Sequence, residues 1–105
     1  GETKTEAATA ARFYDNVTML ARHENVLNGR IENRGDVQGY YKENPIARYA
    51  FVANDFENDV SSLNRTMSDI RKLPDTKENK DKIKRIKEAR LKTMQTLNDL
   101  VRKAQ

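Results

Sequence analysis

The sequence predicts an all-α protein that folds as an antiparallel, up-down bundle of three long helices. With 34% charged residues and only four Gly and two Pro in 105 residues, the composition favours long, well-solvated helices over a sheet with many turns. Apolar residues also recur at alternating spacings of three and four in three segments, which is the pattern of amphipathic helices. No such helix can bury its apolar stripe alone, so we expect the three to pack together. The length allows one domain, residues 1–105.

The first helix is expected near residues 5–33. Its stripe is interrupted at one position, which Glu24 occupies. The Asn28-Gly29 pair accepts left-handed backbone, but Ile31 continues the register, so the helix is expected to run on past this pair. The stripe consists of Ala10, Phe13, Val17, Leu20, Leu27 and Ile31.

The segment from 33 to 45 loses the apolar pattern and is expected to be the main loop. Pro45 suits the first turn of a second helix with Asn44 as its N-cap, and Pro74 is expected to end that helix, giving the range 45–73. Its period of about 3.5 implies mild left-handed supercoiling against its neighbours. The stripe consists of Ile46, Tyr49, Ala53, Phe56, Val60, Leu63, Met67 and Ile70.

The third helix is expected over 76–104, capped by Asp75 or Thr76. Arg90 interrupts its stripe near the middle, as Glu24 does in the first helix. Either these two charges pair across the helices, or the stripe frays and both reach water. The stripe consists of Ile83, Ile86, Ala89, Met94, Leu97, Val101 and Ala104.

Residues for catalysis are lacking. The chain has no cysteine, and its single histidine, His23, has no second histidine or cysteine with which to share a metal. It also has no phosphate-binding glycine loop and no nucleophile elbow, so we predict neither an enzyme nor a cofactor or metal site. No apolar run approaches the roughly 20 residues that span a bilayer. The sequence opens GETKTEAATA, without Met or an apolar signal, as expected of a processed or trimmed chain.

The positive charge is concentrated in the last quarter of the chain. Residues 77–105 hold ten Lys or Arg and four acids, whereas residues 1–76 hold ten bases and twelve acids. Such a helix predicts a largely positive outer face that suits an acidic protein surface. Nucleic acid is disfavoured because no aromatic residue accompanies the bases. A membrane-surface helix is disfavoured because it would need a larger apolar face with Trp or Phe. The candidate partner-binding bases are Lys77, Lys84, Arg85, Lys92, Arg102 and Lys103.

The stretch RYAFVANDFENDV, residues 48–60, resembles the signature of the PsbQ-like extrinsic subunits of photosystem II. The matching residues are Arg48, Ala50, Phe51, Val52, Asp55, Phe56 and Val60, and a second likeness covers 92–104. The resemblance implies a relative of a four-helix bundle that docks without cofactors on photosystem II. It would lie in the thylakoid lumen, peripheral to the membrane. Phe51 lies off the main stripe of its helix and is the apolar candidate for partner binding.

The sequence also resembles the N-terminal three-helix domains of syntaxin-type SNAREs. These domains have a similar length, similar heptads and a turn bounded by proline. This resemblance implies a cytoplasmic interaction module that holds a partner helix in the groove between its own helices. The two readings differ in how the partner is bound, by an exposed charged face in the first and by an apolar groove in the second.

Overall fold

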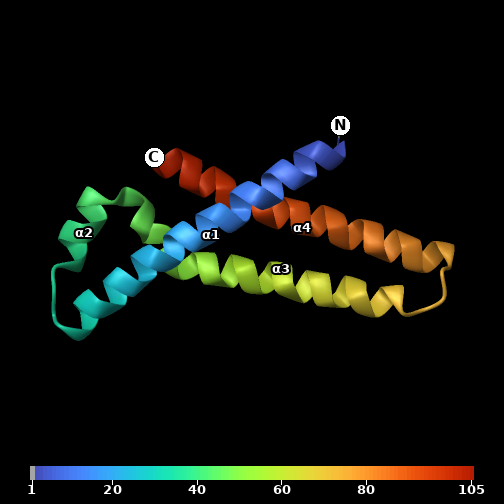
Figure 1. The fold of residues 1–105 in the computed structure, drawn as a ribbon, viewed down its shortest axis with the longest axis horizontal. Helices are drawn as coiled ribbons and strands as arrows, with labels where there is room; N and C mark the ends of the chain where they lie inside the picture. The colour runs from blue at the N-terminus through green and yellow to red at the C-terminus, as the bar shows by residue number, and fades with distance from the viewer. Residues whose placement is uncertain (1) are drawn as a thin grey trace.

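The computed structural model describes residues 2–105, and these residues form helices and connecting turns with no strand (Figure 1). The prediction of an all-α chain is therefore confirmed. The prediction of three helices is incomplete, because a short α-helix and a 3-10 helix lie between the first and second long helices. The elements are α1 (Glu2–Glu32), α2 (Val37–Glu43), η1 (Pro45–Tyr49), α3 (Ala50–Arg71) and α4 (Lys77–Ala104).

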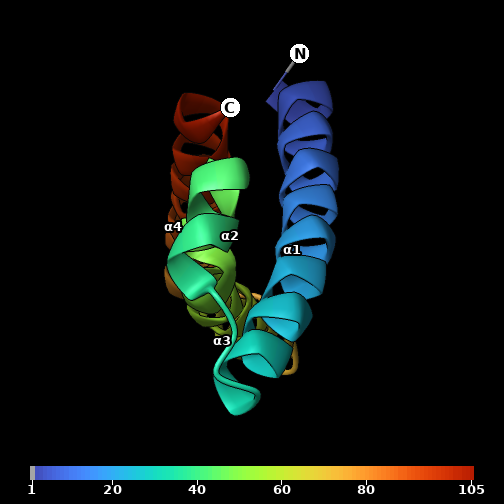
Figure 2. The same ribbon diagram turned by 90° about the vertical axis from the view of Figure 1, so that its left-hand side faces the viewer.

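The long helices form two layers. α3 and α4 run antiparallel as a hairpin, and α1 crosses one side of this hairpin obliquely (Figure 1). Seen from the end, α1 stands on one side and the hairpin on the other (Figure 2). The molecule is correspondingly long and thin, with principal extents of 56 × 29 × 14 Å. α1 covers only part of the hairpin, and only on one side.

The core lies where α1 crosses the hairpin. The side chains of Phe13 and Leu20 are fully buried there, against the contact between α3 and α4 that contains Val60 and Leu97. A second, smaller cluster forms around Leu27 at the far end of α1, where α2 and η1 pack. The first cluster contains Phe13, Leu20, Ala53, Val60, Met94, Leu97 and Val101. The second contains Leu27, Ala47 and Ala50, with Val37, Tyr40 and Tyr41 packed against them.

The expected loop between the first two long helices is largely helical. The Asp36 carboxylate accepts a hydrogen bond of 2.8 Å from the Gly39 N–H and so caps the start of α2. Pro45 does begin a helical turn, as predicted, but a 3-10 turn, and the α-helix proper starts only at Ala50. α2 has seven residues, too few for an apolar period to show in the sequence.

Capping groups determine the helix ends. α1 continues through Asn28-Gly29 as expected and ends in a Schellman arrangement, with the Gly35 N–H donating to the Arg30 carbonyl. Arg34 takes the left-handed position of this motif, at φ 54°. At the start of α4, Thr76 is the residue that caps, because its hydroxyl accepts a 3.1 Å bond from the Asn79 N–H.

Two members of the predicted stripes are exposed. Ile31 is 54% exposed because α1 extends beyond the hairpin at this end. Ala89 is also exposed, while Arg90 and Leu91 after it are half-buried. α1 meets α4 through residues such as Leu91, so the covered face of α4 is turned away from Ala89.

Candidate functional site

The six basic residues singled out in the sequence all lie on α4 and all are exposed. Arg102 forms an ion pair of 3.2 Å with Asp99, one turn before it. Among the residues that the structure describes, the other five make no ion pair and no side-chain hydrogen bond. They are Lys77, Lys84, Arg85, Lys92 and Lys103. These ammonium and guanidinium groups are therefore available to an external anion.

A row of acids divides these bases. Leu97 is fully buried toward the rest of the bundle, and Glu88 lies nine residues, or two and a half turns, before it, on the opposite side of α4. Asp81 and Asp99 fall close to the line of Glu88 by the same count, and all three acids are exposed. The outer face is therefore less uniformly positive than the sequence suggested. It has two basic edges with acids between them.

The two edges of α4 face different surroundings. Lys84 lines a groove of about 450 Å³ with Thr5 and Glu6 of α1, which places its edge beside α1. Helical register puts Arg85 on the other edge, about 100° further around the helix. We call the first set the α1-side edge and the second the open-side edge. The α1-side edge contains Lys77, Lys84 and Arg102, and the open-side edge contains Arg85, Lys92 and Lys103.

Phe51 is not brought together with the bases. Its side chain is 39% exposed, as expected for a residue off the main stripe. Phe51 lies nine residues before Val60, which is buried where α3 contacts α4. Phe51 therefore points away from α4. Phe51 and the bases of α4 thus lie on opposite edges of the hairpin. A flat partner surface cannot touch both.

Glu24 and Arg90 do not pair, so the first of the two interpretations of these charges is wrong. The Arg90 guanidinium donates a 2.7 Å hydrogen bond to the side-chain oxygen of Asn64 on α3. Glu24 is half-buried on the surface between α1 and the start of α3, next to the small residues Ala21 and Ala50. The helix crossing carries Glu24 to α3 and away from Arg90.

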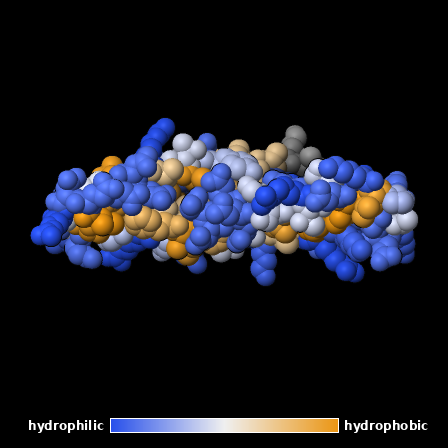
Figure 3. Space-filling model, turned by 90° about the horizontal axis from the view of Figure 1, so that it is seen from below, coloured by the Kyte–Doolittle hydropathy of each residue, from blue (hydrophilic) through white to orange (hydrophobic). Residues whose placement is uncertain are grey.

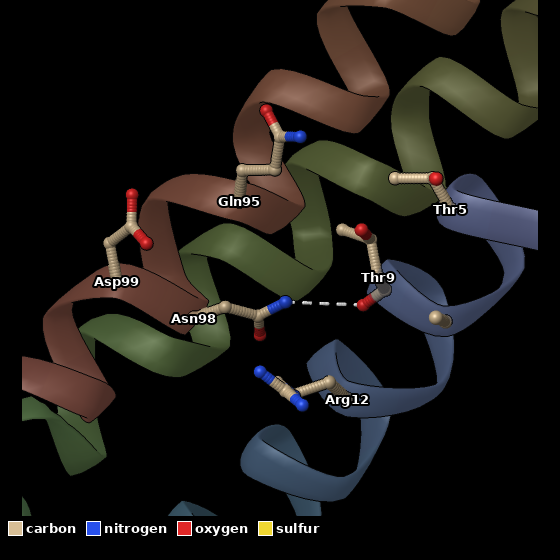
Figure 4. Close-up of a pocket in the computed structure, with 7 residues that line it drawn as sticks. Thr5, Thr9, Arg12, Gln95, Asn98 and Asp99 are labelled. Carbon is tan, nitrogen blue, oxygen red and sulfur yellow. Dashed lines mark hydrogen bonds between the residues drawn. The ribbon is translucent and has the colours of Figure 1, made fainter. Parts of the chain in front are cut away.

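A polar groove of about 550 Å³ lies between the first half of α1 and the last half of α4 (Figure 4). At its floor the Asn98 side-chain amide donates to the Thr9 carbonyl at 3.2 Å, and the Asn98 oxygen accepts from Asn16 at 2.9 Å. The only sequence signal for this groove is the placement of two asparagines near apolar stripes. These hydrogen bonds link α4 to α1.

His23 also has a structural partner. Its Nδ1 lies 2.6 Å from the Tyr40 hydroxyl, and the Arg30 guanidinium lies 4.9 Å from the centre of the Tyr40 ring. These contacts fasten α2 against α1. Within residues 2–105, the structure gathers no group of three or more metal-binding side chains. In the same part of the chain, no helix combines the length and apolar character needed to cross a membrane.

Comparisons of the chain with protein-family models, curated proteins and solved structures found no significant match. The likeness to PsbQ-like subunits and the likeness to syntaxin-type domains therefore both stay predictions.

Proposed function

We propose that this chain is a non-catalytic accessory subunit that docks on an acidic surface of a larger complex through the bases of α4. The observation that carries the proposal is that five of the six candidate bases are exposed and have no ion-pair partner among the residues that the structure describes. Such groups remain hydrated, so they attract an acidic surface without first breaking an internal ion pair. Arg102 already forms an exposed ion pair with Asp99, which lowers its attraction for a partner without cancelling its charge.

The more specific form of the proposal is a PsbQ-like subunit on the lumenal face of photosystem II. It rests on the resemblance over residues 48–60, where Arg48, Phe51 and Val52 are exposed and open to a partner. The cytoplasmic SNARE-like alternative needs an apolar groove between helices. The groove of about 550 Å³ between α1 and α4 is lined largely by polar side chains, so this groove does not suit an apolar partner helix.

A charge reversal on the α1-side edge tests the docking. Lys77→Glu combined with Lys84→Glu removes the two unpaired bases of that edge, and both side chains point away from the core. The fraction of the source cells that retains the wild-type chain at low salt is stripped of it, and each purified variant is then added back. We expect the double variant to rebind at least about tenfold more weakly than the wild type, with an unchanged circular dichroism spectrum.

The matched control is Arg22→Glu combined with Arg65→Glu. It changes the net charge equally but on α1 and α3, where both arginines are exposed. We expect this control to rebind within about twofold of the wild type. If both double variants lost rebinding equally, the effect would come from net charge alone. If neither lost rebinding, this edge of α4 would have no role in docking.

A further inference from the structure

The side of the α3–α4 hairpin away from α1 carries an apolar seam that no other long helix of residues 2–105 covers. Figure 2 shows α1 on one side of the hairpin and no helix on the other, and α2 does not project beyond the hairpin there. Two heptad-spaced series lie along this seam, three residues from each helix, and all six side chains are half-buried. They are Phe56, Leu63 and Ile70 on α3, and Ile86, Thr93 and Leu100 on α4.

The neighbours of these residues locate the covered side. Glu57 and Asn64 of α3, and Lys87 and Met94 of α4, line grooves together with residues of α1. Each of these four follows a member of the two series by one position. One residue turns a helix by about 100°, so the two series lie on the other side of the α3–α4 contact. Heptad spacing on two adjacent helices is the pattern that packs against further helices.

The seam has edges of opposite charge. Asp55, Asp59 and Asp69 are exposed along α3, and the open-side edge of α4 contributes Arg85, Lys92 and Lys103. The Asp69 carboxylate lies 3.9 Å from the Lys72 ammonium group, but both side chains are largely exposed, so this ion pair is weak. Along the open side of α4 Glu78 pairs with Lys82 at 3.7 Å and leaves the net positive charge unchanged. In the view from the α3 side, hydrophilic residues lie between hydrophobic patches (Figure 3).

We propose that a second copy of this chain covers the seam. A two-fold axis parallel to the hairpin would lay α3 of each copy over α4 of the other, so that each acidic edge meets a basic edge. A two-fold axis across the hairpin would instead lay α3 over α3, acid against acid. The charges therefore select the first arrangement, in which the two hairpins form a four-helix bundle with α1 of each copy outside.

The levels of the charges agree with this axis. The hydrogen bond between Asn64 and Arg90 fixes which residues of α3 and α4 lie at the same height. Counting from it along the antiparallel pair, Asp69 lies level with Arg85. By the same count, Asp59 lies within a turn of the level of Lys92, and Asp55 within about a turn of Lys103. A two-fold axis parallel to the helices preserves these levels between copies, so each acid meets a base of the other chain.

This inference does not depend on the proposed docking function. The dimer would use the open-side edge and leave the α1-side edge, with Lys77 and Lys84, exposed to a third protein. The double variant of Lys77 and Lys84 should therefore dimerise as the wild type does. The two claims can fail separately.

Sedimentation equilibrium of the wild type and of two charge-reversed variants tests the dimer. The first variant is Asp59→Lys with Asp69→Lys, and the second is Arg85→Glu with Lys92→Glu. Each makes both edges of the seam alike in sign. We expect the wild type to be dimeric at about 100 µM and each variant to raise the dimer Kd by about tenfold or more. Mixing the two variants should restore a one-to-one dimer, because the edges are then complementary again.

Three results would overturn the inference. A wild type that stays monomeric at about 100 µM would mean that a different partner or an additional segment covers the seam. A dimer that both variants retain would lie on another face. Two monomeric variants, each with the helical spectrum of the wild type, that do not associate when mixed would contradict the parallel two-fold axis.

Discussion

Arg90 of α4 donates a 2.7 Å hydrogen bond to the side-chain oxygen of Asn64 of α3, and this bond joins the hairpin beside the first half of α1. Both side chains are half-buried, and Tyr14 and Met94 lie in the groove beside them. This contact gives a hydrogen-bond acceptor to the guanidinium of Arg90, the residue that interrupts the apolar stripe of α4. A guanidinium in this position needs an acceptor, because partial burial removes some of its water.

Asn64→Ala should lower the free energy of unfolding by about 1–2 kcal/mol, because it leaves the Arg90 guanidinium without its acceptor. Urea unfolding followed by circular dichroism measures the change. Asn64→Asp is the control, since a carboxylate keeps an acceptor and adds an opposite charge. We expect it to be at least as stable as Asn64→Ala, and the reverse order would contradict the role given to this bond.

Asn98→Ala should also destabilise the fold, by about 1–2 kcal/mol, because Asn98 bonds both Asn16 and the Thr9 carbonyl and so links α4 to α1. Thr96→Ala serves as the control. Thr96 is exposed, and its hydroxyl bonds only the Lys92 carbonyl of its own helix. Thermal unfolding should separate the two variants, and equal midpoints would show that the Asn98 link contributes nothing.

Arg34→Gly should raise stability by about 0.5–1 kcal/mol. Arg34 holds a left-handed backbone at φ 54°, which strains any L-residue with a Cβ and leaves glycine unstrained. The gain is smaller than the strain, because glycine also increases the entropy of the unfolded chain. Chemical denaturation provides the measurement, with Arg34→Ala as the control for loss of the side chain. A less stable glycine variant would be inconsistent with the end of α1 described above.

Leu20→Ala should cost about 2–5 kcal/mol, since Leu20 is fully buried where α1 crosses the hairpin. Val26→Ala on the same helix should stay within about 0.5 kcal/mol of the wild type, because Val26 is 44% exposed. The comparison, by urea unfolding, tests which side of α1 faces the core. Similar costs at both positions would mean that α1 is rotated from the orientation described.

The long helices could be predicted from periodicity because burial follows the sequence period directly. Each predicted stripe residue of the second long helix, from Ile46 to Ile70, is buried or half-buried. Proline and the capping threonine also mark the connection between α3 and α4, where Thr76 caps as one of two candidates. These features depend on residues close together in the chain, so they can be predicted from a single sequence.

What the sequence could not predict depends on how the helices cross. The Asn64 partner of Arg90 was not predicted, because which polar residue lies beside Arg90 depends on how the helices pack. α2 was missed because its stability comes from Asp36 and from packing against α1, with no periodic signal of its own. The division of the bases into two edges follows from which side of α4 lies against α1.

The most direct test of the docking role is the salt dependence with which the native chain leaves its complex. Exposed charge pairs weaken as the screening length falls from about 10 Å at 0.1 M salt to about 3 Å at 1 M, whereas apolar contacts hold or tighten. A salt series applied to the cell fraction that holds the chain should release it, intact and helical, well before 1 M. Retention through 1 M salt would contradict docking by charge and would assign the attachment to apolar residues.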